Sequence, residues 1–223
     1  RYAEYVFQLS LLGATLEKIA IEIRNLQRTE IAEVAEYFKK GQMGSSAVPV
    51  KRNPIKSERI SSLSKLLRSQ VSTSFENIPL WHERDLSNSA NERFILPMTS
   101  ILLDEMLETM IKIISNLQVN TKRVKENLYV TKGQIFAEFV LEALIKKGTP
   151  RFKAYRDVQR VAFEAHKKGI NYIDALTNDK IISSILSNNE IKSIFVADKH
   201  LGASVTIINN VEKHVKANSK KFF

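Results

Sequence analysis

The chain has 223 residues, of which 43% are hydrophobic, and a formal net charge of +10. It contains no cysteine, which excludes disulfides and thiolate nucleophiles, and no run of about 18 apolar residues that would predict a transmembrane helix. Because the N-terminus also lacks a signal-peptide pattern, we expect a soluble, cytoplasmic protein whose basic character suits an anionic partner.

The first predicted helix runs from the N-terminus to about Thr29. The chain has only 7 glycines and 5 prolines, which favours helix throughout. Apolar residues recur every three or four positions, and such a seam needs other helices to cover it. The chain starts inside this helix without an initiator Met, so we expect it to be part of a longer protein. The seam consists of Leu9, Leu12, Leu16, Ile19, Ile23 and Leu26.

Two further long helices are predicted. The second begins with Asn53 as N-cap and Pro54 as first helical residue, and it stops before Pro79. The third begins at Ser89, where Ser89 and Glu92 have the spacing of a capping box. Three helices with sustained apolar seams predict an all-α, long-helix bundle domain over residues 1–120. This bundle is expected to be incomplete, because its apolar faces exceed what three helices can cover.

The remaining helices are predicted to be shorter. Gly148 ends one, Thr149 and Pro150 begin the next, and Gly169 ends that one. We therefore expect a second, smaller helical domain over residues 121–223. The lysines of Lys213–Lys221 are interpreted as a solvated helix end, in preference to a nucleic-acid-binding arm.

The segment between the first two helices, residues 42–59, has neither helical nor strand periodicity. Ser45 and Ser46 follow a glycine, where the backbone is free to bend. Lys51 and Asn53 lie six and eight residues after Ser45. A serine acts as a base only where cations and amide donors stabilise its alkoxide, so this composition suits deprotonation of an anionic substrate. From composition alone, an equally good interpretation is a surface loop in which Asn53 only caps a helix and Lys51 is solvated.

One pattern in this segment resembles the signature loop of the fumarase/aspartase superfamily, whose members split a C–N or C–O bond to release fumarate. The pattern is Gly44-Ser45-Ser46-x-x-Pro49-x-Lys51-x-Asn53-Pro54, with Val48 where the superfamily usually has Met. Within the superfamily, KRNPIKSER (residues 51–59) and PLWHERDLSNSANER (residues 79–93) are similar to the adenylosuccinate lyases. The resemblance spans nearly the whole chain and is weakest in its last third.

The resemblance implies a general-base β-elimination that cleaves adenylosuccinate to AMP and fumarate, and SAICAR to AICAR and fumarate, in purine biosynthesis. Ser45 matches the base that takes the proton from the carbon beta to the departing nitrogen. Lys51 and Asn53 match the groups that stabilise the resulting carboxylate intermediate. Glu58 matches the carboxylate that orients a catalytic histidine. No metal or organic cofactor is implied.

The resemblance also implies a set of substrate-binding residues, some of which bind the nucleotide portion of the substrate and its phosphate. Ser89 and Arg93 lie four residues apart at a predicted helix N-terminus, where free N–H groups favour an anion. Taken singly, each of these residues is equally well a helix cap or a surface charge. The implied set is Ser46, Arg52, Arg59, Arg84, Ser89 and Arg93.

The four histidines do not complete this site. No pair has metal-ligand spacing, and none matches a catalytic histidine of the family, which the resemblance places upstream of Arg1. We therefore expect this segment alone to be inactive and poorly soluble. The family assembles as a homotetramer with shared active sites, which would cover the apolar seams. The histidines are His82, His166, His200 and His214.

Two other interpretations stay open. The first is another superfamily member, an argininosuccinate lyase or a carboxymuconate cycloisomerase, which can carry a similar loop. The second is a non-catalytic, basic helical module that binds nucleic acid. The arginines of the implied phosphate site favour a phosphorylated substrate, and the intact Ser45, Lys51, Asn53 and Glu58 set argues for a catalyst. We expect neither nucleic acid nor a membrane as partner.

Overall fold

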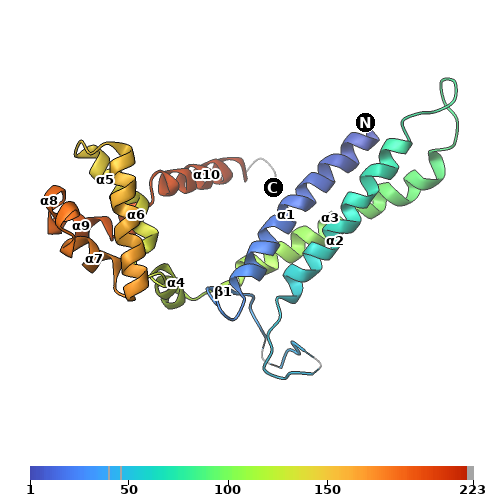
Figure 1. Cartoon of the computed structure of the whole chain (residues 1–223). Coiled ribbons are helices and arrows are strands. Elements are labelled where there is room, and N and C mark those ends of the chain that lie inside the picture. Colours follow the sequence, from blue (N-terminus) through green and yellow to red (C-terminus); the bar gives the residue numbers. More distant parts are fainter. Residues whose placement is uncertain (40, 46, 220–223) are drawn as a thin grey trace. The chain divides into compact units, whose positions relative to one another are not determined.

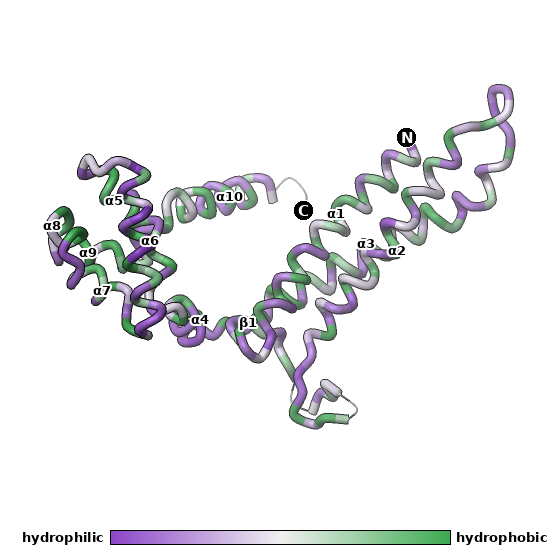
Figure 2. Tube along the Cα trace, in the orientation of Figure 1, coloured by the Kyte–Doolittle hydropathy of each residue, from purple (hydrophilic) through white to green (hydrophobic). Residues whose placement is uncertain are grey.

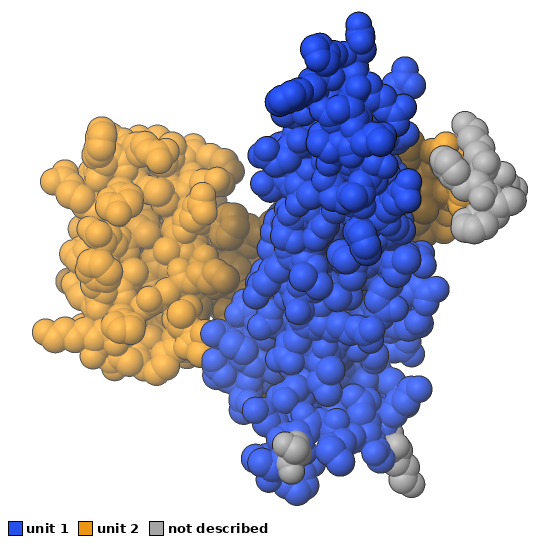
Figure 3. All heavy atoms as spheres, turned by 90° about the vertical axis from the view of Figure 1, so that its right-hand side faces the viewer, with its two compact units in different colours: residues 1–124 blue, residues 125–223 orange. Residues whose placement is uncertain are grey.

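A computed structural model describes residues 1–39, 41–45 and 47–219, which form two compact units, residues 1–124 and 125–223 (Figures 1 and 3). The described part is mostly helical, and its two strands have only two residues each, which confirms the all-α prediction. The first unit contains α1 (Tyr2–Leu26), β1 (Val34–Ala35), α2 (Ile55–Glu76), α3 (Ser89–Ser115) and β2 (Gln118–Val119), and α4 (Thr121–Leu128) crosses the division. The second contains η1 (Gln134–Phe136), α5 (Ala137–Lys146), α6 (Arg151–Lys168), α7 (Tyr172–Asn178), α8 (Lys180–Ile185), α9 (Asn188–Ile194), η2 (Ala197–His200) and α10 (Ser204–Ser219).

The first unit is a bundle of the three long helices α1, α2 and α3. Ile60, Leu67 and Met106 are fully buried at its centre, and burial of each such side chain contributes roughly 1.5–3 kcal/mol. The helices approach closely where α1 has small residues: a Cβ at Gly13 would lie 2.8 Å from Leu67 Cδ1. The hydroxyl of Ser10 donates to the Leu67 carbonyl at 3.0 Å, so this polar residue is buried without losing its hydrogen bond.

The predicted seam of α1 is only partly correct. Leu16 and Ile23 are buried as expected, but Leu12 and Ile19 are exposed. Their places in the buried face are taken by small residues, because α2 packs too closely on α1 for a leucine to fit between them. The small residues are Ser10, Gly13 and Ala20.

Both predicted helix caps are wrong for the same physical reason: in each, a side chain expected to form the cap bonds to another group instead. α2 begins one residue after Pro54, and the Asn53 side chain instead donates to the Gly44 carbonyl at 3.0 Å. α3 begins at Ser89 without a side-chain cap, so the capping box is absent. There the Asn88 amide donates to the Glu92 carboxylate at 3.0 Å.

A short antiparallel strand pair joins the segment after α1 to the segment after α3. Val34 faces Val119 and Ala35 faces Gln118, and the Asn120 N–H donates to the Glu33 carbonyl at 2.8 Å. These two-residue strands were not predicted from the sequence. They hold the segment after α1 beside the end of α3, and the loop of residues 37–54 follows shortly after β1.

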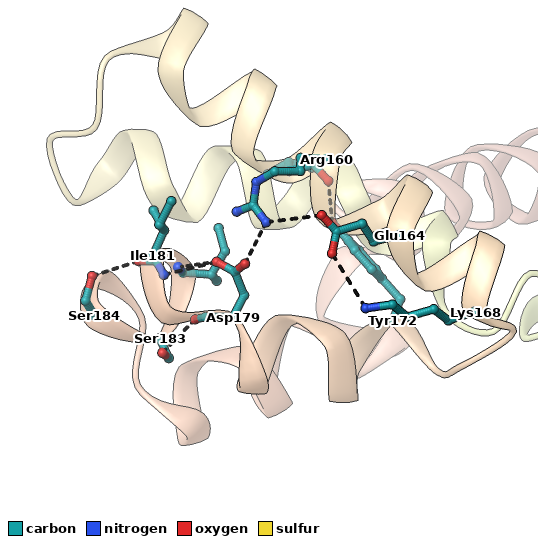
Figure 4. A network of polar contacts seen from close by, with 10 residues as sticks. Arg160, Glu164, Lys168, Tyr172, Asp179, Ile181, Ser183 and Ser184 are labelled. Atoms are coloured by element: carbon teal, nitrogen blue, oxygen red, sulfur yellow. Dashed lines mark hydrogen bonds and ion pairs between the residues drawn. The ribbon is translucent and has the colours of Figure 1, made fainter.

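The second unit packs short helices around Tyr172, Leu144 and Ile182, all fully buried. As predicted, Gly169 ends α6, with a left-handed φ of 65°. An ion pair from Arg160 to Asp179 at 2.8 Å joins α6 to the start of α8 (Figure 4). Burial alone would raise the pKa of Asp179, but hydrogen bonds from Arg160 and from the first N–H groups of α8 hold it below its usual value.

Large apolar side chains remain exposed along the three-helix bundle, as the sequence analysis expects. The tube in Figure 2 shows apolar and polar residues interleaved along each long helix. The exposed residues on α1 include Tyr2, Tyr5, Phe7, Leu11 and Ile21, and those on α3 include Phe94, Ile101, Ile111 and Ile114.

Candidate active site

The loop between β1 and α2 closes on itself near its tip. The Gly44 carbonyl accepts the Asn53 side-chain amide at 3.0 Å, which joins the two sides of the loop. The backbone of Gly44 also passes against the Lys51 carbonyl oxygen so tightly that a Cβ would overlap it. The Arg52 guanidinium lies 5.6 Å from the centre of the Phe38 ring, a cation–π distance. Ser45, Lys51 and Asn53 are therefore carried by one crossed loop.

The Ser45 hydroxyl oxygen accepts two backbone hydrogen bonds. The N–H groups of Ala47 and Val48 donate to Ser45 Oγ at 3.3 and 3.2 Å. Two N–H dipoles aimed at one oxygen stabilise negative charge on it, which lowers the cost of an alkoxide. Ser46, the predicted substrate contact, lies outside the described residues.

A cleft of about 870 Å³ lies between the end of α1 and the returning side of the loop. It brings together Lys51, Arg52, Asn53 and Glu58 of the predicted set. Four cationic side chains and one carboxylate line it, a formal excess of three positive charges that suits an anionic ligand. The cations are Arg24, Arg28, Lys51 and Arg52, and the carboxylate is Glu58.

Two arginines of this cleft, Arg24 at the end of α1 and Arg28 just after it, were not predicted from the sequence. Arg24 donates to the Ser61 hydroxyl at 3.1 Å, and Arg28 pairs with Glu30 at 3.3 Å. Arg24 lies in the last turn of α1, and Arg28 follows the end of that helix at Leu26. Nothing near them in the sequence indicates that the loop returns beside these two residues.

The predicted phosphate-binding residues do not lie at the loop. Arg84, Ser89 and Arg93 follow the far end of α2, which has 22 residues and so spans roughly 33 Å at 1.5 Å per residue. In Figure 1 the loop and the α2–α3 connection are at opposite ends of the bundle. Arg59 stays near the loop end, where it pairs with Glu105 of α3 at 3.1 Å.

The connection that carries Arg84 is organised by Asp85. Its carboxylate accepts the Trp81 and Ser87 N–H groups, both at 2.7 Å, and the Ser87 hydroxyl at 2.5 Å. The Ser87 hydroxyl first, and then the N–H groups of Trp81 and Ser87, hold the pKa of Asp85 below its usual value. These hydrogen bonds fix the conformation of the turn and therefore the backbone position of the neighbouring Arg84.

Among the described residues, no group of three or more His, Cys, Asp or Glu side chains is arranged to hold a metal ion. Within the same described ranges, no helix has both the length and the apolar character needed to cross a bilayer.

Comparison with known proteins relates both units to one family. Residues 133–211 match the family described as adenylosuccinate lyase C-terminus, and residues 1–67 match the family described as lyase. An adenylosuccinate lyase from Synechocystis sp. is 46% identical over 202 residues, which cover 90% of this chain and 47% of that protein. The chain belongs to the adenylosuccinate lyase family. This membership places it in the fumarase/aspartase superfamily, as its signature loop indicates.

Two further adenylosuccinate lyases show the same relation. The protein from Pyrococcus abyssi is 41% identical over 99% of this chain and 49% of its own length. The protein from Thermotoga maritima is 41% identical over 96% of this chain and 49% of its own length. The chain thus spans about half the length of the adenylosuccinate lyases that it matches.

Solved structures of the superfamily share the fold. A 3-carboxy-cis,cis-muconate lactonizing enzyme from Pseudomonas putida matches 96% of this chain and 47% of its own with a TM-score of 0.82 and 26% identity. A fumarate lyase from Mesorhizobium sp. BNC1 matches 94% of this chain and 46% of its own, also with a TM-score of 0.82, at 24% identity. At this low identity, the second likeness concerns the fold alone.

Proposed function

We propose that the protein containing this chain is an adenylosuccinate lyase, which cleaves adenylosuccinate to AMP and fumarate and SAICAR to AICAR and fumarate. The observation that carries this proposal is the 41–46% identity to three adenylosuccinate lyases across 90–99% of the chain. The muconate lactonizing enzyme, which has the same fold, is only 26% identical. Sequence therefore favours adenylosuccinate lyase over the other superfamily activities.

Ser45 is the proposed base. Its oxygen takes the proton from the carbon beta to the departing nitrogen, the C–H electrons form the double bond of fumarate, and the C–N bond breaks. A histidine from outside this chain protonates the leaving nitrogen. The two N–H groups that donate to Ser45 Oγ support this role, because they stabilise the alkoxide that the step requires.

Lys51 and Asn53 are the proposed stabilisers of the carboxylate intermediate, and Glu58 is the proposed partner of the catalytic histidine. The positive charge of the cleft that all three line supports a role beside an anion. Arg52 lies in the same cleft as a proposed substrate contact. The reaction needs a base, an acid and fixed charges, so we expect turnover to persist in the presence of a chelating agent.

Arg59, Arg84, Ser89 and Arg93 form the proposed nucleotide and phosphate site, and Ser46 is a further proposed substrate contact. The separation of roughly 33 Å between the two ends of α2 supports a site shared between subunits. In such an assembly, the far end of one bundle supplies Arg84, Ser89 and Arg93 to the loop of another, which carries its own Arg59 nearby. The exposed apolar residues of α1 and α3 support the homotetramer that we propose for the cytoplasmic enzyme.

Turnover by the complete protein tests the proposal. We expect fumarate release from adenylosuccinate, and a Ser45→Ala variant that still binds substrate but loses kcat by a factor of about 10³ or more. Ser62→Ala removes an exposed hydroxyl of α2 and serves as the matched control. Fumarate release from argininosuccinate but not from adenylosuccinate would contradict the proposal. Salt-sensitive RNA binding without lyase activity would favour the non-catalytic interpretation.

A further inference from the structure

The loop of residues 37–54 has no core of its own. None of its described residues is buried, so the hydrophobic effect does little to hold it in place. Its position relative to the bundle must therefore come from polar contacts at its two ends. Those contacts converge on two side chains, Gln27 and Glu36.

Glu36 fixes the start of α2. Its carboxylate accepts the Ser57 N–H at 2.7 Å, the Ser57 hydroxyl at 2.6 Å and the Lys56 N–H at 3.2 Å. These bonds satisfy free donors of the first helical turn, where a side-chain cap is missing. Glu36 is only 7% exposed. A buried carboxylate with three donors is a strong anchor, because charge-assisted hydrogen bonds are about twice as strong as neutral ones.

Gln27 ties the two sides of the loop to the end of α1. Its side-chain oxygen accepts the Glu36 N–H at 2.9 Å, and its side-chain nitrogen donates to the Arg52 carbonyl at 3.1 Å. One amide thus contacts the residue before the loop and a residue of its returning side. The two bonds use opposite ends of the amide, so a flipped orientation would break both.

We propose that Gln27 and Glu36 are positioning residues that set the place of the signature loop for catalysis. Gln27 acts through the backbone of Arg52, next to Lys51 and Asn53. Glu36 acts through the first turn of α2, which carries Glu58. This role rests on the proposed function of the loop. We call the hydrogen-bonded group of Gln27, Glu36 and Ser57 the stem of the loop. The stem is defined by its hydrogen bonds and does not depend on the proposed function.

The first test is steady-state kinetics of the complete protein. Glu36→Ala leaves three donors without their acceptor, so we expect kcat to fall by about 10–100-fold with a smaller change in KM, as for a misplacement on the order of 1 Å. Glu36→Gln keeps one oxygen acceptor and should recover part of that loss. Gln27→Glu keeps the acceptor for the Glu36 N–H but loses the donor to Arg52, so it should lower kcat without disturbing α2. Glu22→Gln, an exposed carboxylate on α1, is the control.

The second test does not depend on activity. Lys51 and Arg52 lie on the returning side of the loop, so trypsin can report its release from the stem. We expect Glu36→Ala and Gln27→Glu to be cleaved at Lys51 and Arg52 at least several-fold faster than the wild type, while far-ultraviolet circular dichroism stays unchanged. Glu22→Gln should be cleaved at the wild-type rate.

The two tests separate failure of this inference from failure of the proposed function. If the wild type does not release fumarate but the variants are cleaved faster, the stem stands and the adenylosuccinate lyase activity does not. If the wild type is active and Gln27→Glu keeps both its kcat and its resistance to trypsin, the inference is wrong. It is equally wrong if the loss of kcat in every variant only follows a loss of folded protein.

Discussion

Replacement of Gly44 by alanine should disable the loop without unfolding the protein. The added Cβ would overlap the Lys51 carbonyl oxygen and touch the Phe38 ring at 3.0 Å. Cβ atoms in proteins essentially never come closer than 3.0 Å to such neighbours. The Lys51 backbone therefore has to retreat, and the Gly44 carbonyl moves away from the Asn53 amide that it accepts.

The size of the effect follows from this displacement. The Lys51 carbonyl must move by about 1 Å, and a displacement of that size at a catalytic group costs about 100-fold in rate. Loss of the Asn53 hydrogen bond lowers the free energy of unfolding by about 1 kcal/mol. Because none of the described loop residues is buried, we expect no larger loss, and a melting temperature within about 4 °C of the wild type.

The assay compares kcat for fumarate release by the complete protein with that of two alanine variants. Gly41→Ala is the matched control, since Gly41 has a φ of 81° but no atom within 4 Å of an added Cβ. It introduces backbone strain of about 1–2 kcal/mol without a clash, so its kcat should change only a few-fold. Wild-type kcat in Gly44→Ala would refute the reasoning, and so would an equal loss in both variants.

Three further predictions concern stability. Met106→Ala should lower the free energy of unfolding of the first unit by about 2–5 kcal/mol in urea titrations, because Met106 is fully buried. Gly169→Ala should cost about 1 kcal/mol, because φ is 65° at this helix end. Lys147 and then Ser187 lower the pKa of Glu190 from 4.5 to about 2, so the carboxylate's stabilising effect is complete above pH 4.5 and is lost as the pH falls towards 2. Glu190→Gln should flatten that part of the pH–stability curve.

Each stability prediction has an outcome that would contradict it. Met98→Ala is the control for the core, since Met98 is 42% exposed, and an equal loss in both variants would show that burial does not set the cost. Gly169→Asn should be tolerated better than Gly169→Ala, because asparagine adopts left-handed φ more readily, and the reverse order would be inconsistent. Unchanged pH dependence in Glu190→Gln would show that its contacts do not persist in solution.

Local patterns in the sequence were enough to predict the helices and the loop between them. The three- and four-residue spacing of apolar side chains reports helix because it depends only on neighbours along the chain. Gly169 could be read as a helix end for the same reason. The signature loop was recognisable from a fixed string of residues, and the family comparison agrees with it.

Only the tertiary structure decides which groups the helices and the loop bond to and pack against. Asn53 has the local signal of a helix cap, yet its amide is taken by Gly44, nine residues away. The α2 cap comes instead from Glu36, 21 residues before Ser57. Which face of α1 is buried likewise depends on how closely α2 packs against Gly13.

Sequence alone thus determined which residues form helices and which segment carries the chemistry, because both depend on short-range spacing. Tertiary structure decided what holds that segment in place, because hydrogen bonds between distant residues have no periodic signal along the chain. It also showed that Arg84 and Ser89 lie at the far end of the bundle from Ser45. The residues of the predicted site are thus divided between two ends of one long helix pair, a separation that no motif in the sequence indicates.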